Sequence, residues 1–307
     1  MTAIMSAPEN GLRAWLRSET PKNAFQSAMQ QVYRGALRFA SHPLGVIGLI
    51  VILLLIAAAA LAPWITGYDP AQQDMVGRLQ PPSADHWFGT DEYGRDVFTR
   101  VIYGARTTLH IIVLVTVIVA PIGLILGACA GTLGGRIDEV LMRITDIFLS
   151  IPGLVLALGF AAALGPGITN AIIAIALTAW PPMARLARAE ALSLRHADFI
   201  AAVRLQGASR GRIILRHILP MCLPSVVVRL TLNMAGIILT AAGLGFLGLG
   251  AQPPLAEWGA MVSTGREFMI DCPWVITAPG IAIALVSLAF NLVGDALRDV
   301  LDPRLGA

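Results

Sequence analysis

Long apolar stretches alternate along this chain with short stretches that hold nearly all of its charged residues. A charge at the middle of a bilayer costs about 2.5–3.5 kcal/mol, so an apolar run of ~20 residues predicts a transmembrane helix. The apolar runs are 39–68, 107–135, 147–184, 217–246 and 272–294. The run 147–184 is too long for one span, and Gly165-Pro166-Gly167 favours a turn within it. The pattern therefore predicts an all-α membrane protein with six transmembrane helices.

Lysine and arginine gather on one side of these predicted spans. If the N-terminus is inside, the inner segments hold Arg13, Arg17, Lys22, Arg34, Arg38, Arg136, Arg143, Arg185, Arg188, Arg195, Arg204, Arg210, Arg212, Arg216, Arg298 and Arg304. The outer segments hold Arg78, Arg95, Arg100, Arg106 and Arg266. The outer acidic residues are Asp69, Asp74, Asp85, Asp91, Glu92 and Asp96. Positive residues beside spans stay in the cytoplasm, so we expect both termini to be cytoplasmic.

The expected organisation follows from these boundaries. It comprises a cytoplasmic N-terminal segment 1–40, a first span 41–67, a periplasmic segment 68–106, a transmembrane domain 107–300 that includes a cytoplasmic loop 185–220, and a C-terminus 301–307. Within the periplasmic segment, Val97, Phe98, Val101 and Ile102 recur on one side of a helix, which predicts an interfacial helix. Its polar side would carry an Asp96–Arg100 pair four residues apart.

The composition excludes several kinds of chemistry. Only 13% of the residues are charged, against about 25% in a soluble domain. Lys22 is the only lysine, and its sequence TPKN cannot form a phosphate-binding loop. The three cysteines and five histidines show no metal-ligand spacing. We therefore expect no catalytic residue, cofactor or metal in this chain.

The cytoplasmic stretch 198–220 holds several arginines between apolar runs. Any arginine-rich loop would satisfy the charge bias, but this one also predicts a helix of about two turns. Asp198 would be its N-cap and Gly207 its C-terminal stop. Phe199, Ala202, Val203 and Gln206 would form one side. Two turns are too few to be stable alone, so we expect neighbouring elements or a partner to support this helix.

FIAAVRLQGASRGRIILRHILP (199–220) resembles the cytoplasmic loop of permease subunits in binding-protein-dependent ABC importers. The family pattern is Glu-Ala-Ala, three residues, Gly, nine residues, Ile, one residue, Leu-Pro. Ala201 replaces the glutamate and His217 the isoleucine, but the spacing to Gly207 and to Leu219-Pro220 is kept. The resemblance implies that this loop contacts the ATPases, through Asp198, Phe199, Ile200, Ala201, Ala202, Val203, Arg204, Gly207, Leu219 and Pro220.

Three further stretches resemble the C subunits of dipeptide, oligopeptide and nickel permeases. They are HWFGTDEYGRDVFTRVIYGAR (86–106), LGFLGLGAQPPLAEWGAM (244–261) and AFNLVGDALRDVLDPRL (289–305). The resemblance implies a type I importer permease fold in a bacterial cytoplasmic (inner) membrane. It also implies four other chains: a second permease subunit, two cytoplasmic ATPases that bind ATP and Mg, and an outer solute-binding protein. Lipid surrounds such a subunit, and nucleic acid has no part.

Two groups of residues are candidates for other sites. Arg229 lies inside the fifth apolar run, where it either faces a pore or reaches toward the cytoplasmic headgroups. Asn233 and Asn291 are candidates for the pore or for a helix interface. Candidates for docking the solute-binding protein, against the alternative of a structural belt at the membrane surface, are Gln252, Pro253, Pro254, Glu257 and Trp258.

The expected function is to form, with the second permease subunit, a path for di- or oligopeptides. Nickel, a metal chelate, glutathione or another small peptide-like solute is the alternative within the same family. An ion-coupled secondary transporter would need acidic residues at mid-membrane and inverted repeats, and the predicted spans lack a central Asp or Glu. A membrane-embedded enzyme would need a clustered nucleophile, base or metal site, and the sequence suggests none.

Overall fold

The computed structural model describes Trp15 and residues 23–301, and within this part every regular element is helical. The predictions for Arg13, Arg17, Lys22, Arg304 and the C-terminus 302–307 lie outside the described residues. The helices are α2 (Ala24–Ala40), α3 (Pro43–Ile65), α4 (Val97–Leu133), α5 (Gly135–Leu149), α6 (Gly153–Leu164), α7 (Ile168–Leu194), α8 (Asp198–Leu205), α9 (Arg210–Ile213), α10 (Leu219–Phe246), α11 (Trp258–Gly265) and α12 (Trp274–Leu301).

The count of six spans is not confirmed. Among the described residues, four helical stretches are long and apolar enough to cross a membrane: α3, α4, Arg210–Phe246 and α12. The pair α5 and α6 would make a fifth, but the two helices meet at 88°. The predicted turn at Gly165–Gly167 does separate α6 from α7. However, α7 contains three charged residues and two prolines in its second half, which lower its hydropathy.

The fifth predicted run begins earlier than expected. Arg210–Phe246 is one continuous helical stretch, made of α9, one π-helical turn over Ile214–Ile218, and α10. Pro220 has no amide hydrogen to donate to the preceding turn, and the π-helical turn lies just before it. Because the helical stretch begins at Arg210, it extends out of the apolar run into the arginine-rich loop.

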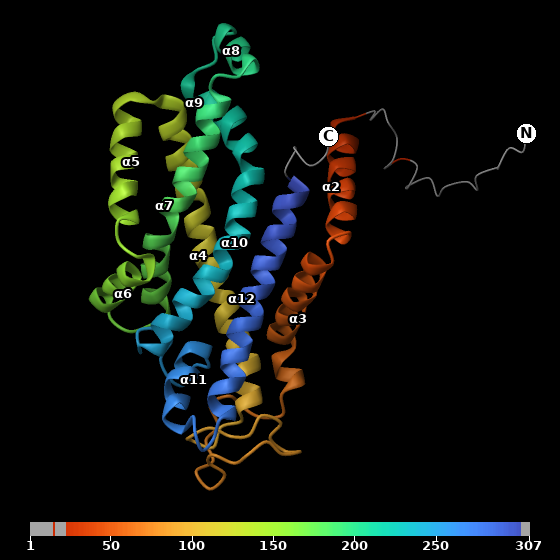
Figure 1. Ribbon diagram of the computed structural model, residues 1–307, viewed down its shortest axis with the longest axis vertical. Coiled ribbons are helices and arrows are strands. Elements are labelled where there is room, and N and C mark those ends of the chain that lie inside the picture. The colour runs from red at the N-terminus through yellow and green to blue at the C-terminus, as the bar shows by residue number, and fades with distance from the viewer. Residues whose placement is uncertain (1–14, 16–22, 302–307) are drawn as a thin grey trace, which may run out of the picture.

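The long helix α4 packs along α7 in the interior of the bundle (Figure 1). Three glycines of α4, four residues apart, make the close approach possible. A Cβ on Gly123 would lie 2.6 Å from Met183, and one on Gly127 would clash with the carbonyl oxygen of Ala184. Gly131 meets Ala191 in the same way. Small residues at this spacing let membrane helices approach backbone to backbone, so α4 and α7 form one tightly packed unit.

Helix α12 packs between α3 and α10, and α2 continues beyond α3 along the far part of α12 (Figure 1). The two ends of the bundle differ. One end holds α8 and the start of α9, at the top of Figure 1, and we name it the α8 end. The other holds α11 and the segment between α3 and α4, at the bottom of Figure 1, and we name it the α11 end.

The expected interfacial helix is not a separate element. Residues 97–106 are the first turns of α4, which runs from Val97 to Leu133 without a break. Asp96 caps this helix, since its carboxylate accepts a hydrogen bond from the amide of Thr99 at 2.7 Å. Nothing between Val97 and the apolar run ends the helix: Gly104 stays helical and gives room for Trp258, whose indole would lie 2.5 Å from a Cβ at this position.

Candidate functional site

Helix α8 exists where the sequence predicts it, but it begins one residue earlier. Ala197 has the extended backbone of an N-cap residue, and Asp198 is already the first helical residue. The predicted capping role of Asp198 is therefore wrong, because no side chain caps this helix. The amides of Ile200 and Ala201 are bonded to the carbonyl of Ala197 instead. Asp198 still places its negative charge at the N-terminal end of the helix, where it is favoured.

The predicted stop at Gly207 is confirmed. This glycine has φ +84°, in the left-handed region. Its amide donates to the carbonyl of Arg204 at 3.0 Å, and the amide of Ala208 donates to Val203 at 3.3 Å. These two bonds form the pattern that commonly closes a helix at a left-handed glycine. The chain then turns directly into α9, whose cap Ser209 accepts from the amide of Arg212 at 3.3 Å.

The predicted stripe of α8 is mostly exposed, and only Val203 of it packs on the bundle. Ile200 is fully buried, and Val203 packs beside it against Ile213 and the ends of α4 and α7. Phe199 is 40% exposed, and Ala202 and Gln206 are exposed as well. The helix is held to the bundle by Ile200, which lies one position away from the predicted stripe. Phe199 is thereby left free to meet a partner.

The remaining residues of the predicted loop lie around this anchor. Ala201 and Arg204 are exposed on α8, and Leu205 at its end is 91% exposed. Leu219 and Pro220 form the first turn of α10, where Leu219 is half-buried and Pro220 is exposed. We name α8, the turn 206–209 and α9 the knob. It presents apolar and cationic side chains outward while its isoleucines fix it to α4 and α7.

The three candidates in the spans are not brought together into one site. Arg229 is exposed on α10, and within the described part of the chain it takes part in no ion pair. Asn233 lies one turn further along α10 and is half-buried, whereas Asn291 is exposed on α12. Their roles in a pore or a helix interface therefore stay predictions.

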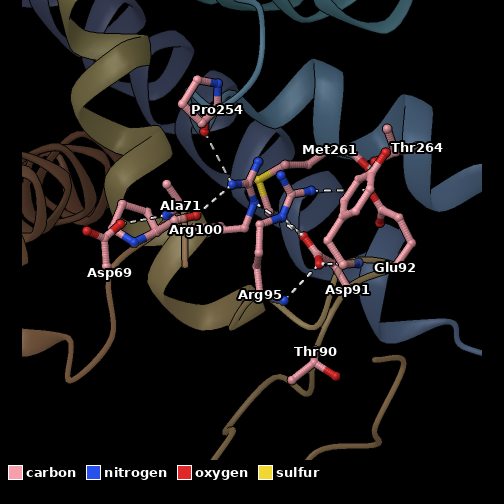
Figure 2. A network of polar contacts seen from close by, with 12 residues as sticks. Asp69, Ala71, Thr90, Asp91, Glu92, Arg95, Arg100, Pro254, Met261 and Thr264 are labelled. Atoms are coloured by element: carbon pink, nitrogen blue, oxygen red, sulfur yellow. Dashed lines mark hydrogen bonds and ion pairs between the residues drawn. The ribbon is translucent and has the colours of Figure 1, made fainter. Parts of the chain in front are cut away.

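The α11 end contains a cluster of charged side chains that includes residues expected on the polar side of an interfacial helix. Asp91, Arg95, Asp96 and Arg100 are each only 4–6% exposed. The Arg95 guanidinium donates to Asp91 at 2.6 Å and to Glu92 at 3.2 Å. Figure 2 shows these side chains converging where the segment before α4 meets the loop before α11. We name Asp91, Glu92, Arg95 and Arg100 the ionic cluster.

Arg100 joins three segments of the chain at this cluster. Its Nη1 donates to the carbonyl of Pro70 at 2.8 Å and reaches that of Pro254 at 3.5 Å, and its Nε lies 3.5 Å from Asp91 (Figure 2). The expected Asp96–Arg100 pair is wrong. The Asp96 carboxylate caps α4 and contacts His86 Nδ1 at 2.9 Å instead. The buried Arg100 side chain thus connects the backbone at Pro70 with the backbone at Pro254.

Burial raises the pKa of two glutamates at this end. Desolvation, followed by the neighbouring charge of Asp91, raises the pKa of Glu92 above its ordinary value. Burial likewise raises the pKa of Glu257, which accepts hydrogen bonds from the amides of Gly259 and Ala260 at 2.8 Å. No group of His, Cys, Asp and Glu among the described residues could hold a metal ion.

The predicted docking residues divide into two kinds. The side chains of Glu257 and Trp258 are buried, Glu257 as the cap of α11 and Trp258 as a donor to the carbonyl of Val101 at 2.9 Å. Neither side chain is available on the surface. Gln252, Pro253 and Pro254 are exposed and remain candidates for a docking contact.

One signal in the sequence could have identified the ionic cluster. DEYGRDVFTR (91–100) holds three acidic residues and two arginines in a short stretch that is nearly neutral. Charges that compensate one another locally can be buried together, because each finds a partner without a distant contact. The helical period of the apolar residues pointed instead to an exposed polar face.

Comparisons with known proteins agree with this architecture. A family model described as "Binding-protein-dependent transport system inner membrane component" matches residues 120–307. A second, described as "N-terminal TM domain of oligopeptide transport permease C", matches residues 27–82.

Three relatives match along most of their length. The chain is 48% identical over 264 residues to a probable D,D-dipeptide transport system permease protein of Escherichia coli (strain K12), covering 86% of this chain and 89% of the relative. It is 47% identical to a dipeptide transport system permease protein of Alkalihalophilus pseudofirmus, covering 86% and 87%. It is 42% identical to a nickel transport system permease protein of E. coli (strain K12), covering 84% and 94%.

A solved structure shows the same fold. An inward-facing form of the MetNI methionine ABC transporter contains a chain that superposes with a TM-score of 0.54 at 20% identity, covering 66% of this chain and 96% of that chain. At this level of identity the match concerns the fold alone. The family model covers more than half of the sequence and, with the relatives, identifies this chain as a member of the binding-protein-dependent transport system inner membrane components, a permease subunit of an ABC importer, and the superposition shows the type I fold.

Proposed function

We propose that this chain forms, with a second permease subunit, the membrane path of an ATP-driven importer for di- or oligopeptides. The observation that carries this proposal is the knob. A short helix is fixed at Ile200 to α4 and α7, the most closely packed helix pair of the bundle, and it projects the exposed side chains of Phe199 and Leu205. A partner that holds these side chains can move α4 and α7 together.

The partners follow from this assignment. Two ATPases bind ATP and Mg and receive the knob, and a solute-binding protein meets the α11 end. The α8 end is then cytoplasmic and the α11 end extracytoplasmic, with both termini inside, as the distribution of arginine supports. Reporter fusions after residue 307 and within 69–85 test the orientation: signals from opposite compartments support it, and matching compartments contradict it.

The ATPase contact is tested by Phe199→Asp. A charge at this position should prevent burial of the ring in a groove of the ATPase, and ATPase co-purification and solute uptake should both fall to background. Ile270→Asp is a matched control, because Ile270 is 89% exposed at the α11 end and should leave ATPase association unchanged. If Phe199→Asp keeps full association and full uptake, the knob is not the ATPase contact.

The peptide substrate rests on the relatives' names, two of which specify dipeptides. A nickel permease also matches, which makes nickel the second candidate. Uptake of a labelled dipeptide and of nickel should be compared in cells that lack their own permeases for both and produce all subunits of this system. Dipeptide uptake without nickel uptake supports the proposal, and the reverse result replaces it.

A further inference from the structure

A hollow of about 580 Å³ lies between the knob and the ends of α4 and α7. Its lining includes Thr132, Arg195, His196, Arg204, Ser209 and Arg210. We name it the arginine pocket. Its volume falls in the range of small-molecule sites, about 300–1,000 Å³. Arg204, Ser209 and Arg210 belong to the knob, but Phe199 and Leu205, the exposed side chains that the proposed ATPase contact relies on, are not part of this lining.

The pocket carries positive charge without a matching carboxylate. Among the described residues none of Arg195, Arg204 and Arg210 forms an ion pair, and no acidic residue lines the hollow. Outside the lining, the Asp138 carboxylate is electrostatically coupled to Arg195. This carboxylate is already engaged by both nitrogens of Arg188, at 2.5 and 2.7 Å. Three guanidinium groups thus line one hollow that contains no acidic side chain, and a bound anion would neutralise their charge.

The hydrogen-bonding groups of the lining are donors as well. Arg195 donates to Nε2 of His196 at 2.9 Å, which places the ring proton on Nδ1 and leaves it able to donate. Ser209 accepts from the amide of Arg212, so its own hydroxyl proton is available. The buried hydroxyl of Thr132 has no hydrogen-bond partner among the described residues. A ligand with several acceptor oxygens suits this set.

We propose that the arginine pocket binds a phosphate group. A phosphate offers negative charge and oxygen acceptors that fit the planar fork of arginine. Two sources share this chemistry: the headgroup of an anionic phospholipid beside the knob, and a soluble phosphate compound in the cytoplasm. A site at this position would tie the knob to the membrane or to the metabolic state of the cell, independently of which solute is carried.

The test uses the full chain purified with its second permease subunit. In the lipid arm, native mass spectrometry of complexes in nanodiscs counts retained phosphatidylglycerol against phosphatidylcholine. In the soluble arm, calorimetry in a zwitterionic detergent measures binding of inorganic phosphate and pyrophosphate. The double variant Arg204→Gln/Arg210→Gln removes two charge-assisted contacts and should weaken binding of the recognised probe about tenfold or more.

Arg136→Gln/Arg143→Gln is the matched control. It removes the same charge from two exposed arginines of α5, at the same end of the bundle but outside the pocket, and it should leave binding unchanged. Thr132→Val keeps the side-chain shape and all the arginines, so it tests the site even if the arginine double variant fails to fold. It should weaken binding a few-fold.

Each outcome decides the proposal. Selective loss of phosphatidylglycerol in the pocket variants supports a lipid headgroup, and selective loss of phosphate or pyrophosphate binding supports a soluble ligand. Equal losses in the α5 control would show a general charge effect and overturn the site. Loss of ATPase co-purification from cells that produce all subunits, with unchanged binding of every probe, would assign these arginines to the ATPase interface, which also overturns the proposal.

Discussion

The two ends of this bundle bury opposite kinds of side chain from their amphipathic segments. At the α11 end, Asp91, Arg95 and Arg100 are buried and the charges meet one another. At the α8 end, Ile200 and Ile213 are buried, and Arg204 and Arg210 remain exposed. Both segments lie beside the ends of spans, and both alternate apolar residues with arginine.

The difference lies in the local supply of opposite charge. The stretch 91–100 provides three carboxylates for two arginines, whereas Asp198 is the only acidic residue in 198–220. Removing a charge from water costs several kcal/mol unless a partner and hydrogen bonds replace the lost hydration. Arginines with carboxylates close by can therefore be buried. Arginines without them stay exposed to water, and the isoleucines of the segment are buried instead.

The largest effect should come from removing a carboxylate of the ionic cluster. Asp91→Ala leaves two buried arginines without their shared partner and frees the amides of Tyr93 and Arg95. Loss of one partner of a buried pair costs about 3–5 kcal/mol. We expect a clear fall in the thermal unfolding midpoint of the purified protein. Asp85→Ala, an exposed position in the same segment, should change it little, and equal effects of the two variants would contradict the contrast.

At the α8 end, Ile200→Ala should be the most destabilising change. It removes the fully buried anchor of the knob, a loss of about 2–5 kcal/mol for such a truncation. We expect faster proteolysis within 195–210 and weaker ATPase association. Phe199→Ala on the exposed side should weaken association while leaving the knob as resistant to protease as before. Rapid proteolysis of the Phe199 variant would show that both sides of α8 anchor it.

Two glycines of the knob allow a finer comparison. A Cβ added to Gly207 or to Gly211 would meet no atom within 4 Å, but only Gly207 has a positive φ. Gly207→Ala should cost about 1–2 kcal/mol through backbone strain alone, and Gly211→Ala should be neutral or slightly stabilising. ATPase co-purification across a salt series measures the difference. Similar behaviour of the two variants would mean that the left-handed turn does not hold the knob in place.

The smallest effect concerns pH at the ionic cluster. The raised pKa of Glu92 means that the folded state holds this proton more tightly than the unfolded state. The Glu92 contribution to stability therefore falls as pH rises from the ordinary glutamate pKa through the raised value, and is constant above it. Glu92→Gln keeps an oxygen for Arg95 and cannot ionise, so its unfolding midpoint should rise relative to the native protein over that window. A difference independent of pH would show that Glu92 titrates normally.

The parts of the fold that the sequence predicted are those fixed by local chemistry. The apolar runs located the long helices, Gly165–Gly167 the turn, and Gly207 the end of α8. Parts that depend on distant contacts were missed. The face of α8 that is buried depends on Ile213 and the end of α4. The burial of Arg100 depends on the carbonyls of Pro70 and Pro254, which are far from it in the sequence.

Trp258 is a second residue whose position in the fold could not be predicted from the sequence. A tryptophan beside a predicted span suggests the membrane surface, yet this one is buried against α4 where Gly104 leaves room for its indole. The sequence carries no sign that residues 104 and 258 meet. Only the packing of the loop before α11 onto α4 decides it.

Helix α4 connects the two ends as one continuous helix. Its 37 residues span about 55 Å at 1.5 Å each. It begins among the charges around Arg100, and its other end contributes Thr132 and Leu133 to the wall of the arginine pocket. A helix of this length converts a small rotation into a large displacement. A tilt of about 5° about one end shifts the other end by about 5 Å. A slight rocking of α4 at the ionic cluster is thus equivalent to a displacement of the knob by about one helical turn.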